Sequence, residues 1–120
     1  MKESGEMYLE TILILSNRQD TVRSIDIAEY MNYSKPSVSR AVGNLKRGGY
    51  IEVDGQGGIT LTKAGREKAE NIYERHLVLS EIFESLGVSR ETAVDDACRV
   101  EHVISDETFA AFKKHLESKR

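Results

Sequence analysis

The residues whose types and spacing most suggest chemistry lie in the last quarter of the chain. Cys98, Glu101 and His102 stand at positions i, i+3 and i+4, so on a helix their side chains emerge on one face. A thiolate, a carboxylate and an imidazole are donors that transition metals accept. Near the N-terminus, Met7 and Glu10 stand at i and i+3 and offer two further donors. The sequence therefore predicts a metal-binding protein with these five residues as candidate ligands.

A second group of candidates is polar and basic and gathers on a predicted helix that begins at Ser34. Hydroxyls and cations at its start can reach phosphates, and the planar fork of Arg40 suits a guanine edge. Lys46 and Arg47 at its end, with Arg23 before the preceding helix, are better placed for contacts with the DNA backbone. A solvated helix face is the competing interpretation. The candidate DNA-binding residues are Arg23, Ser34, Lys35, Pro36, Ser37, Ser39, Arg40, Lys46 and Arg47.

Apolar periodicity and capping residues predict the elements that must position these groups. Apolar residues recur at helical spacing over 4–17 and 25–31. Ser24 is the expected cap of the second helix, and Ser34 caps a third that ends at Gly48. Further along, the sequence predicts two strands, at 50–53 and 59–61, around a glycine-rich tip. A long helix should follow from the cap Thr62 to Leu86. Two shorter helices are expected after it, one over 89–103 and one that begins near residue 105.

Two helices joined by a short turn and followed by a glycine-rich hairpin are the order of a winged helix-turn-helix. In that motif the second helix of the pair lies in the major groove of DNA, which agrees with its polar surface here. We therefore expect a mainly α fold that binds double-stranded DNA. One winged domain reads a single half-site, so we also expect a homodimer on a pseudo-palindromic operator.

Composition and charge exclude several classes of protein. The 120 residues, 39% hydrophobic and 31% charged, exclude a large multi-domain enzyme. The formal charge of -3 conceals a basic middle, because residues 21–66 carry a net charge of +3. A lone cysteine forms no internal disulfide, and the charged N-terminus is unlike a signal peptide, so we expect a cytoplasmic protein. No apolar run approaches the roughly 20 residues of a membrane span, so we expect no membrane role.

Four motifs carry a family resemblance. They are Glu6–Leu9, Ser34–Ser39, Leu61–Gly65 and, above all, Ala97–Asp106. Together they resemble the iron-dependent repressors of the diphtheria toxin repressor family over essentially the whole chain. The resemblance implies a winged helix-turn-helix DNA-binding domain, here residues 1–66, followed by metal-binding and dimerisation helices, here residues 67–120. It implies a regulatory metal site with Met7, Cys98, Glu101 and His102 as ligands.

The chain departs from the family pattern at the ancillary metal site. The positions of its usual ligands fall on His76, Ser80 and Val94, so only the histidine remains. Glu10 instead resembles a glutamate of the manganese-responsive branch, which together with His76 and Glu101 could hold a second ion. The chain also stops where many iron-dependent relatives continue into a small β-rich domain, so we expect no contribution from such a domain.

The expected function is a metal-activated transcriptional repressor that controls metal homeostasis genes. Fe(II) is the first choice of metal because thioether and thiolate ligands favour softer ions, while Mn(II), Co(II), Ni(II) and Zn(II) remain open. Three alternatives stay open: a manganese-responsive regulator, a metal-independent winged-helix regulator whose helical half only dimerises, and a metal-buffering or hydrolytic protein. We expect no enzyme, because the chain offers no nucleophile with a positioned base and no phosphate-binding loop.

Overall fold

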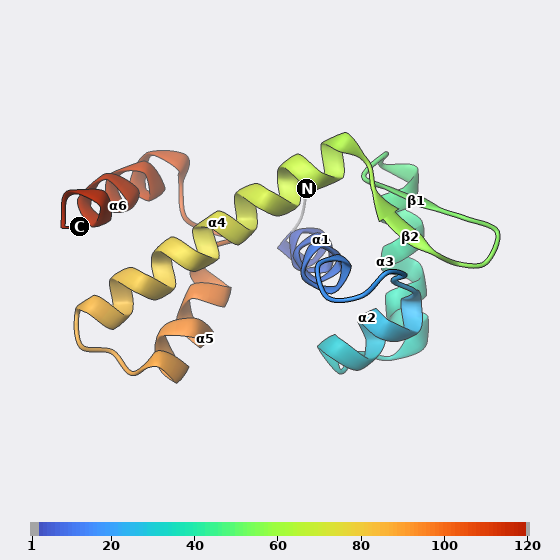
Figure 1. The fold of residues 1–120 in the computed structure, drawn as a ribbon, viewed down its shortest axis with the longest axis horizontal. Coiled ribbons are helices and arrows are strands. Elements are labelled where there is room, and N and C mark those ends of the chain that lie inside the picture. The colour runs from blue at the N-terminus through green and yellow to red at the C-terminus, as the bar shows by residue number, and fades with distance from the viewer. Residues whose placement is uncertain (1–2, 120) are drawn as a thin grey trace. The chain divides into compact units, whose positions relative to one another are not determined.

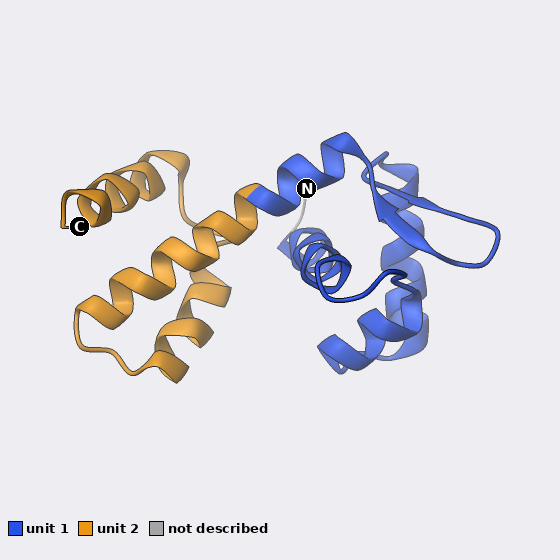
Figure 2. Ribbon diagram, viewed as in Figure 1, with its two compact units in different colours: residues 1–70 blue, residues 71–120 orange. Residues whose placement is uncertain are grey.

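The structure is a computed structural model that describes residues 3–119 (Figure 1). It confirms the mainly α winged helix-turn-helix fold. The elements are α1 (Glu3–Ser16), α2 (Ser24–Met31), α3 (Lys35–Arg47), β1 (Ile51–Val53), β2 (Ile59–Leu61), α4 (Lys63–Ser85), α5 (Arg90–Val100) and α6 (Asp106–Ser118). They form two compact units, Met1–Glu70 and Asn71–Arg120, which divide within α4 (Figure 2).

The core of the first unit is built around α1. The apolar side chains of α1 point to most sides of the helix, and such a helix must be covered by its neighbours. Leu9 and Ile12 are fully buried, as are Ile27 of α2, Val38 of α3 and Ile51 of β1. The core therefore joins the helix-turn-helix pair to the hairpin.

Local capping sets the boundaries of α2 and α3. The side chain of Ser34 accepts a hydrogen bond from the backbone N–H of Ser37, as a capping residue does. Asn32 ends α2 in the left-handed conformation, with φ of 57°. The prediction that Ser24 caps α2 was wrong, because Arg23 takes that position and its N–H donates to the carboxylate of Asp26 at 2.8 Å.

The wing is a short antiparallel hairpin whose strands pair Ile51 with Leu61 and Val53 with Ile59. Its tip is organised by Asp54, whose carboxylate accepts hydrogen bonds from the backbone N–H groups of Gln56 and Gly58. These two hydrogen bonds favour the ionised form, so the pKa of Asp54 lies below its ordinary value. The glycine-rich tip therefore has a defined turn.

The beginning of α4 packs closely against the start of β1. Thr62 caps the helix by accepting a hydrogen bond from the N–H of Gly65 at 3.1 Å, as the sequence predicts. A Cβ atom at Gly65 would lie 1.9 Å from the carbonyl oxygen of Tyr50. The position therefore requires glycine because the two backbones approach so closely.

The second unit consists of the remainder of α4 with α5 and α6. Its buried apolar residues are Ile72, Leu79, Ile82, Ala93, Ala97, Phe109 and Leu116. Gly87, with φ of 96°, ends the turn after α4 as predicted. The predicted helix over 89–103 was too long, because α5 ends at Val100 and residues 101–104 form a turn.

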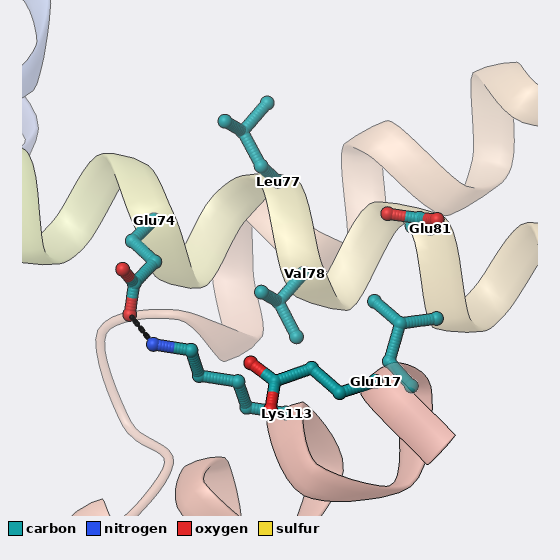
Figure 3. Close-up of a pocket in the computed structure, with 7 residues that line it drawn as sticks. Glu74, Leu77, Val78, Glu81, Lys113 and Glu117 are labelled. Atoms are coloured by element: carbon teal, nitrogen blue, oxygen red, sulfur yellow. Dashed lines mark hydrogen bonds and ion pairs between the residues drawn. The ribbon is translucent and has the colours of Figure 1, made fainter. Parts of the chain in front are cut away.

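A groove of about 430 Å³ runs between α4 and α6 within the second unit (Figure 3). One ion pair bridges it, because Lys113 Nζ lies 3.0 Å from Glu74 Oε1. The lining residues are Glu74, Leu77, Val78, Glu81, Lys113, Leu116 and Glu117.

Within the part of the chain that the structure describes, no helix has the length and apolarity needed to cross a membrane.

Candidate functional site

Three candidate ligands meet in the second unit. His76 lies on α4, Cys98 on α5, and Glu101 in the turn that follows α5. One donor atom of each lies within 4.8 Å of the others. The helical spacing of α5 places Cys98 near Glu101, while the packing of α4 against α5 adds the imidazole of His76. Residues 22 to 25 positions apart in the chain thus converge on one point.

The carboxylate of Glu101 lies between two imidazoles. His76 Nδ1 is 2.9 Å from Glu101 Oε2, and His102 Nε2 is 3.2 Å from Glu101 Oε1. Burial would raise the pKa of this fully buried carboxyl, but hydrogen bonds and charges from His102 and His76 outweigh it and hold the pKa below its ordinary value. Glu101 is therefore ionised at neutral pH, which is the form that binds a cation.

The donor set fits a transition-metal ion. In a four-coordinate tetrahedral site, ion-to-ligand distances of about 2.0 to 2.3 Å place neighbouring ligand atoms roughly 3.3 to 3.8 Å apart. The donor atoms of His76, Cys98 and Glu101 lie within 4.8 Å of one another, so binding one ion requires them to close by about 1 to 1.5 Å at most. The side chain of His102 is 3% exposed and adjoins the same carboxylate. Two imidazoles, a thiolate and a carboxylate suit Fe, Co or Zn better than Mg or Ca.

The two other predicted ligands lie in the first unit. Met7 is half-buried and Glu10 is buried, both on α1. Their roles as ligands stay predictions. At the ancillary positions, Ser80 on α4 and Val94 on α5 are half-buried and supply neither an imidazole nor a carboxylate. His76 takes part in the cluster with Cys98 instead.

Sequence reasoning missed Arg75, which lies beside the cluster. Its guanidinium donates to the carbonyl oxygens of Glu101 and Ile104, at 3.5 Å and 2.7 Å. A signal for it exists in the sequence. Within α4, Arg75 stands three residues after Ile72 and four before Leu79, so it occupies a core-facing position of the helical period. A charged residue at such a position indicates a buried partner.

Most of the predicted DNA-binding residues are exposed on or beside α3. Ser37 is the exception, because it is half-buried and its hydroxyl accepts from Ser34 Oγ at 2.8 Å. Arg40 Nη2 lies 3.4 Å from the same hydroxyl of Ser37, a weak contact that leaves the arginine side chain exposed. The exposed members of the set are Arg23, Ser34, Lys35, Pro36, Ser39, Arg40, Lys46 and Arg47.

Arg23 connects the helix-turn-helix to the wing. Its Nε donates to the carbonyl oxygen of Gln56, at the wing tip, at 3.1 Å. An aromatic side chain that sequence reasoning did not include, Tyr33, is 44% exposed in the turn before α3. Its ring contacts that of Tyr8 edge to face, with centroids 6.1 Å apart. Hydroxyls, cations and an aromatic ring thus share the surface around the start of α3.

The sequence matches two family models. Residues 1–59 match "Iron dependent repressor, N-terminal DNA binding domain" and residues 62–119 match "Iron dependent repressor, metal binding and dimerisation domain". The chain is 34% identical to an uncharacterized HTH-type transcriptional regulator of Methanocaldococcus jannaschii over an alignment of 120 positions, which covers 98% of this chain and 95% of that protein.

Other similar proteins are longer. The diphtheria toxin repressor of Corynebacterium diphtheriae is 33% identical over 116 residues, which cover 96% of this chain and 51% of that one. Among solved structures, that of the manganese regulator SloR has a TM-score of 0.83 and 31% identity, covering 94% of this chain and 53% of SloR. The chain thus spans about half the length of these two proteins.

Proposed function

Because this chain belongs to the iron-dependent repressor family, we propose that it is a metal-activated transcriptional repressor that binds a pseudo-palindromic DNA operator as a homodimer. The observation that carries the proposal is the cluster of half-buried His76 and Cys98 with buried Glu101, whose donor atoms lie within 4.8 Å of one another. His102 completes the set from the adjacent position. Neighbouring imidazole, thiolate and carboxylate donors are the chemistry that a regulatory metal needs.

Fe(II) is the activating ion in this proposal. Cys98 supplies a thiolate, a soft ligand that favours iron over manganese. The pKa of Glu101 is lowered, so this carboxyl holds no proton that must be displaced at neutral pH. His76, Cys98, Glu101 and His102 would hold the divalent ion, which would supply positive charge next to the thiolate and the carboxylate. The similarity to a manganese regulator supports Mn(II) as the second candidate.

The DNA-binding residues act in two ways in this proposal. Arg40, exposed on α3, reads a base edge in the major groove, whereas Lys46 and Arg47 at the end of α3 contact phosphates. Arg23 holds the wing tip through Gln56 and adds a backbone contact. Met7 and Glu10 remain candidate ligands from α1, so metal binding that includes them would favour one arrangement of the two units.

The test is DNA binding with and without metal. Fluorescence anisotropy with the promoter region of the protein's own gene, in anaerobic reducing buffer, compares the apo chain with chains in Fe(II), Mn(II), Co(II), Ni(II) and Zn(II). We expect a gain of roughly 5- to 150-fold in affinity with Fe(II). His102→Ala should abolish this gain, while the matched control His115→Ala, at an exposed position of α6, should keep it. Equal affinity of the apo and metal-loaded chains would instead support a metal-independent regulator.

A further inference from the structure

Arg75 is a buried charge next to the metal cluster that ligand chemistry alone does not explain. The residue is 9% exposed, and arginine is rarely so buried unless it is paired. Its guanidinium carbon lies 5.2 Å from the centroid of the Phe109 ring and its Nη2 pairs with the carboxylate of Asp106. Because the Asp106 side chain is 95% exposed, this ion pair by itself contributes little to stability.

The remaining contacts of Arg75 are with the main chain beside the candidate ligands. Nη1 donates to the carbonyl of Ile104 at 2.7 Å and, more weakly, to that of Glu101 at 3.5 Å. Carbonyl groups at the C-terminal end of a helix have no donors within that helix. Since α5 ends at Val100, the guanidinium supplies donors to the turn of residues 101–104.

Two consecutive residues of α4 therefore hold Glu101 at both ends. His76 binds its carboxylate at 2.9 Å, and Arg75 binds its main-chain carbonyl. His102, the next residue, belongs to the same turn and lies 3.2 Å from the carboxylate. A side chain that is held at its backbone and at its tip keeps few rotamers. The direction of the Glu101 carboxylate is thus set by the protein.

We propose that Arg75 is a positioning residue of the metal centre, which fixes the turn of residues 101–104 so that Glu101 and His102 face His76 and Cys98. This inference rests on the proposed function and adds a residue that acts through the ligands. Arginine suits the role because its planar fork serves two carbonyls and a carboxylate at once, whereas the ammonium of lysine is a single point charge on a flexible stem.

The experiment measures metal binding by the full chain directly, with Co(II) as the spectroscopic probe. Co(II) titrations compare the wild type with Arg75→Lys and Arg75→Met by absorption spectroscopy, and circular dichroism verifies the helical content of each apo protein. We expect both variants to bind Co(II) about 10- to 100-fold more weakly. The ligand-field bands should shift as Glu101 and His102 lose their orientation, while the charge-transfer band from the Cys98 thiolate persists.

A matched control separates positioning of the turn from attachment of α6 to α4. Lys113→Met removes the ion pair between Lys113 and Glu74, which also joins these two helices but lies in the groove of Figure 3. We expect its Co(II) affinity to stay within about threefold of the wild type, as for most surface substitutions.

A folded Arg75→Lys variant with the affinity and spectrum of the wild type would overturn the inference while leaving the proposed function intact. A wild-type chain that shows no thiolate-to-cobalt band would refute both. One measurement needs no substitution: on addition of Zn(II) to the wild type, the guanidinium signals of Arg75 should shift in NMR spectra. Unchanged signals of Arg75 beside shifted ring signals of His76 would contradict the inference even if both variants fail to fold.

Discussion

The substitution Glu101→Gln tests the centre of the proposed site, because it removes the charge and keeps the size of the side chain. Glu101 is fully buried and its two carboxylate oxygens face His76 and His102 at 2.9 Å and 3.2 Å. An amide retains one oxygen acceptor and replaces the other with an NH2 donor. The variant therefore lacks the anionic ligand, and one of the two imidazoles faces a poorer partner.

The expected size of the effect follows from the position of Glu101 among the donors. Loss of a group that merely supports a metal ligand lowers affinity about 10- to 100-fold. Glu101 is itself a candidate ligand and its lowered pKa keeps it ionised, so we expect a loss of at least about 100-fold, or about 2.8 kcal/mol. The metal-dependent gain in DNA affinity, roughly 1 to 3 kcal/mol for such coupling, should disappear at metal concentrations that saturate the wild type.

The assay pairs two readouts on the same samples. Co(II) titration monitored by absorption measures metal affinity, and fluorescence anisotropy with the promoter region measures DNA affinity in Co(II) and in anaerobic Fe(II). Glu91→Gln, an exposed glutamate at the start of α5, is the matched control and should resemble the wild type. If Glu101→Gln binds Co(II) within about threefold of this control, the assignment of Glu101 as a ligand is refuted.

Four further outcomes are expected. The ionised form of Glu101 stabilises the fold at pH values above its ordinary pKa of 4.5, and this contribution is lost as the pH falls through its lower pKa in the folded chain. The wild type and Glu101→Gln should therefore differ less in their free energies of unfolding in acid than at neutral pH, as measured by urea denaturation. Gly65→Ala should lower the free energy of unfolding by about 1 to 3 kcal/mol, measured by the same method, because the added methyl would lie 1.9 Å from a backbone carbonyl oxygen. Arg40→Ala should remove about 1 to 3 kcal/mol of the preference for operator over random DNA. Lys46→Ala should instead weaken binding to operator and to random DNA alike, and should reduce the slope of log affinity against log salt concentration by about one. Equal losses of affinity for operator and random DNA in both variants would disprove these different roles of Arg40 and Lys46. Cys98→Glu should shift activation of DNA binding from Fe(II) toward Mn(II), and unchanged preference would count against the thiolate as the selective ligand.

Most of the fold could be predicted from the sequence because its elements are defined by local signals. The Ser34 and Thr62 caps and the left-handed Gly87 act within a few residues, and the structure has them as predicted. Two predictions were wrong, one for a local reason and one for a tertiary reason. Ser24 looked like a cap, but the carboxylate of Asp26 made Arg23 the cap position. The predicted helix over 89–103 ends early, at Val100, and Arg75 of α4 donates hydrogen bonds to the turn that follows.

The candidate site was only partly predictable. The spacing of Cys98, Glu101 and His102 puts them on one face only if the helix continues through His102. In the structure α5 ends at Val100, so Glu101 and His102 stand in a turn. They nevertheless remain together because adjacent residues in a turn stay close. His76 was a candidate ligand only because of the family resemblance, since a single histidine on a long helix does not by itself indicate metal binding. The core-facing position of Arg75 within α4 can be read from the sequence, but its partners cannot, because main-chain carbonyls have no signature there.

The sequence by itself determined the order and type of the elements, the polar face of α3, and the presence of metal-binding residue types near one another in the chain. Periodicity, caps and turn residues suffice for this, because they act over one or two helical turns. Only the tertiary structure decided that His76 meets Glu101 across 25 residues and that Arg75 meets Ile104 across 29. It likewise decided that Gly65 must be glycine. These contacts depend on how closely helices and strands pack, and packing distances of a few ångströms are a property of the assembled core that no local pattern encodes.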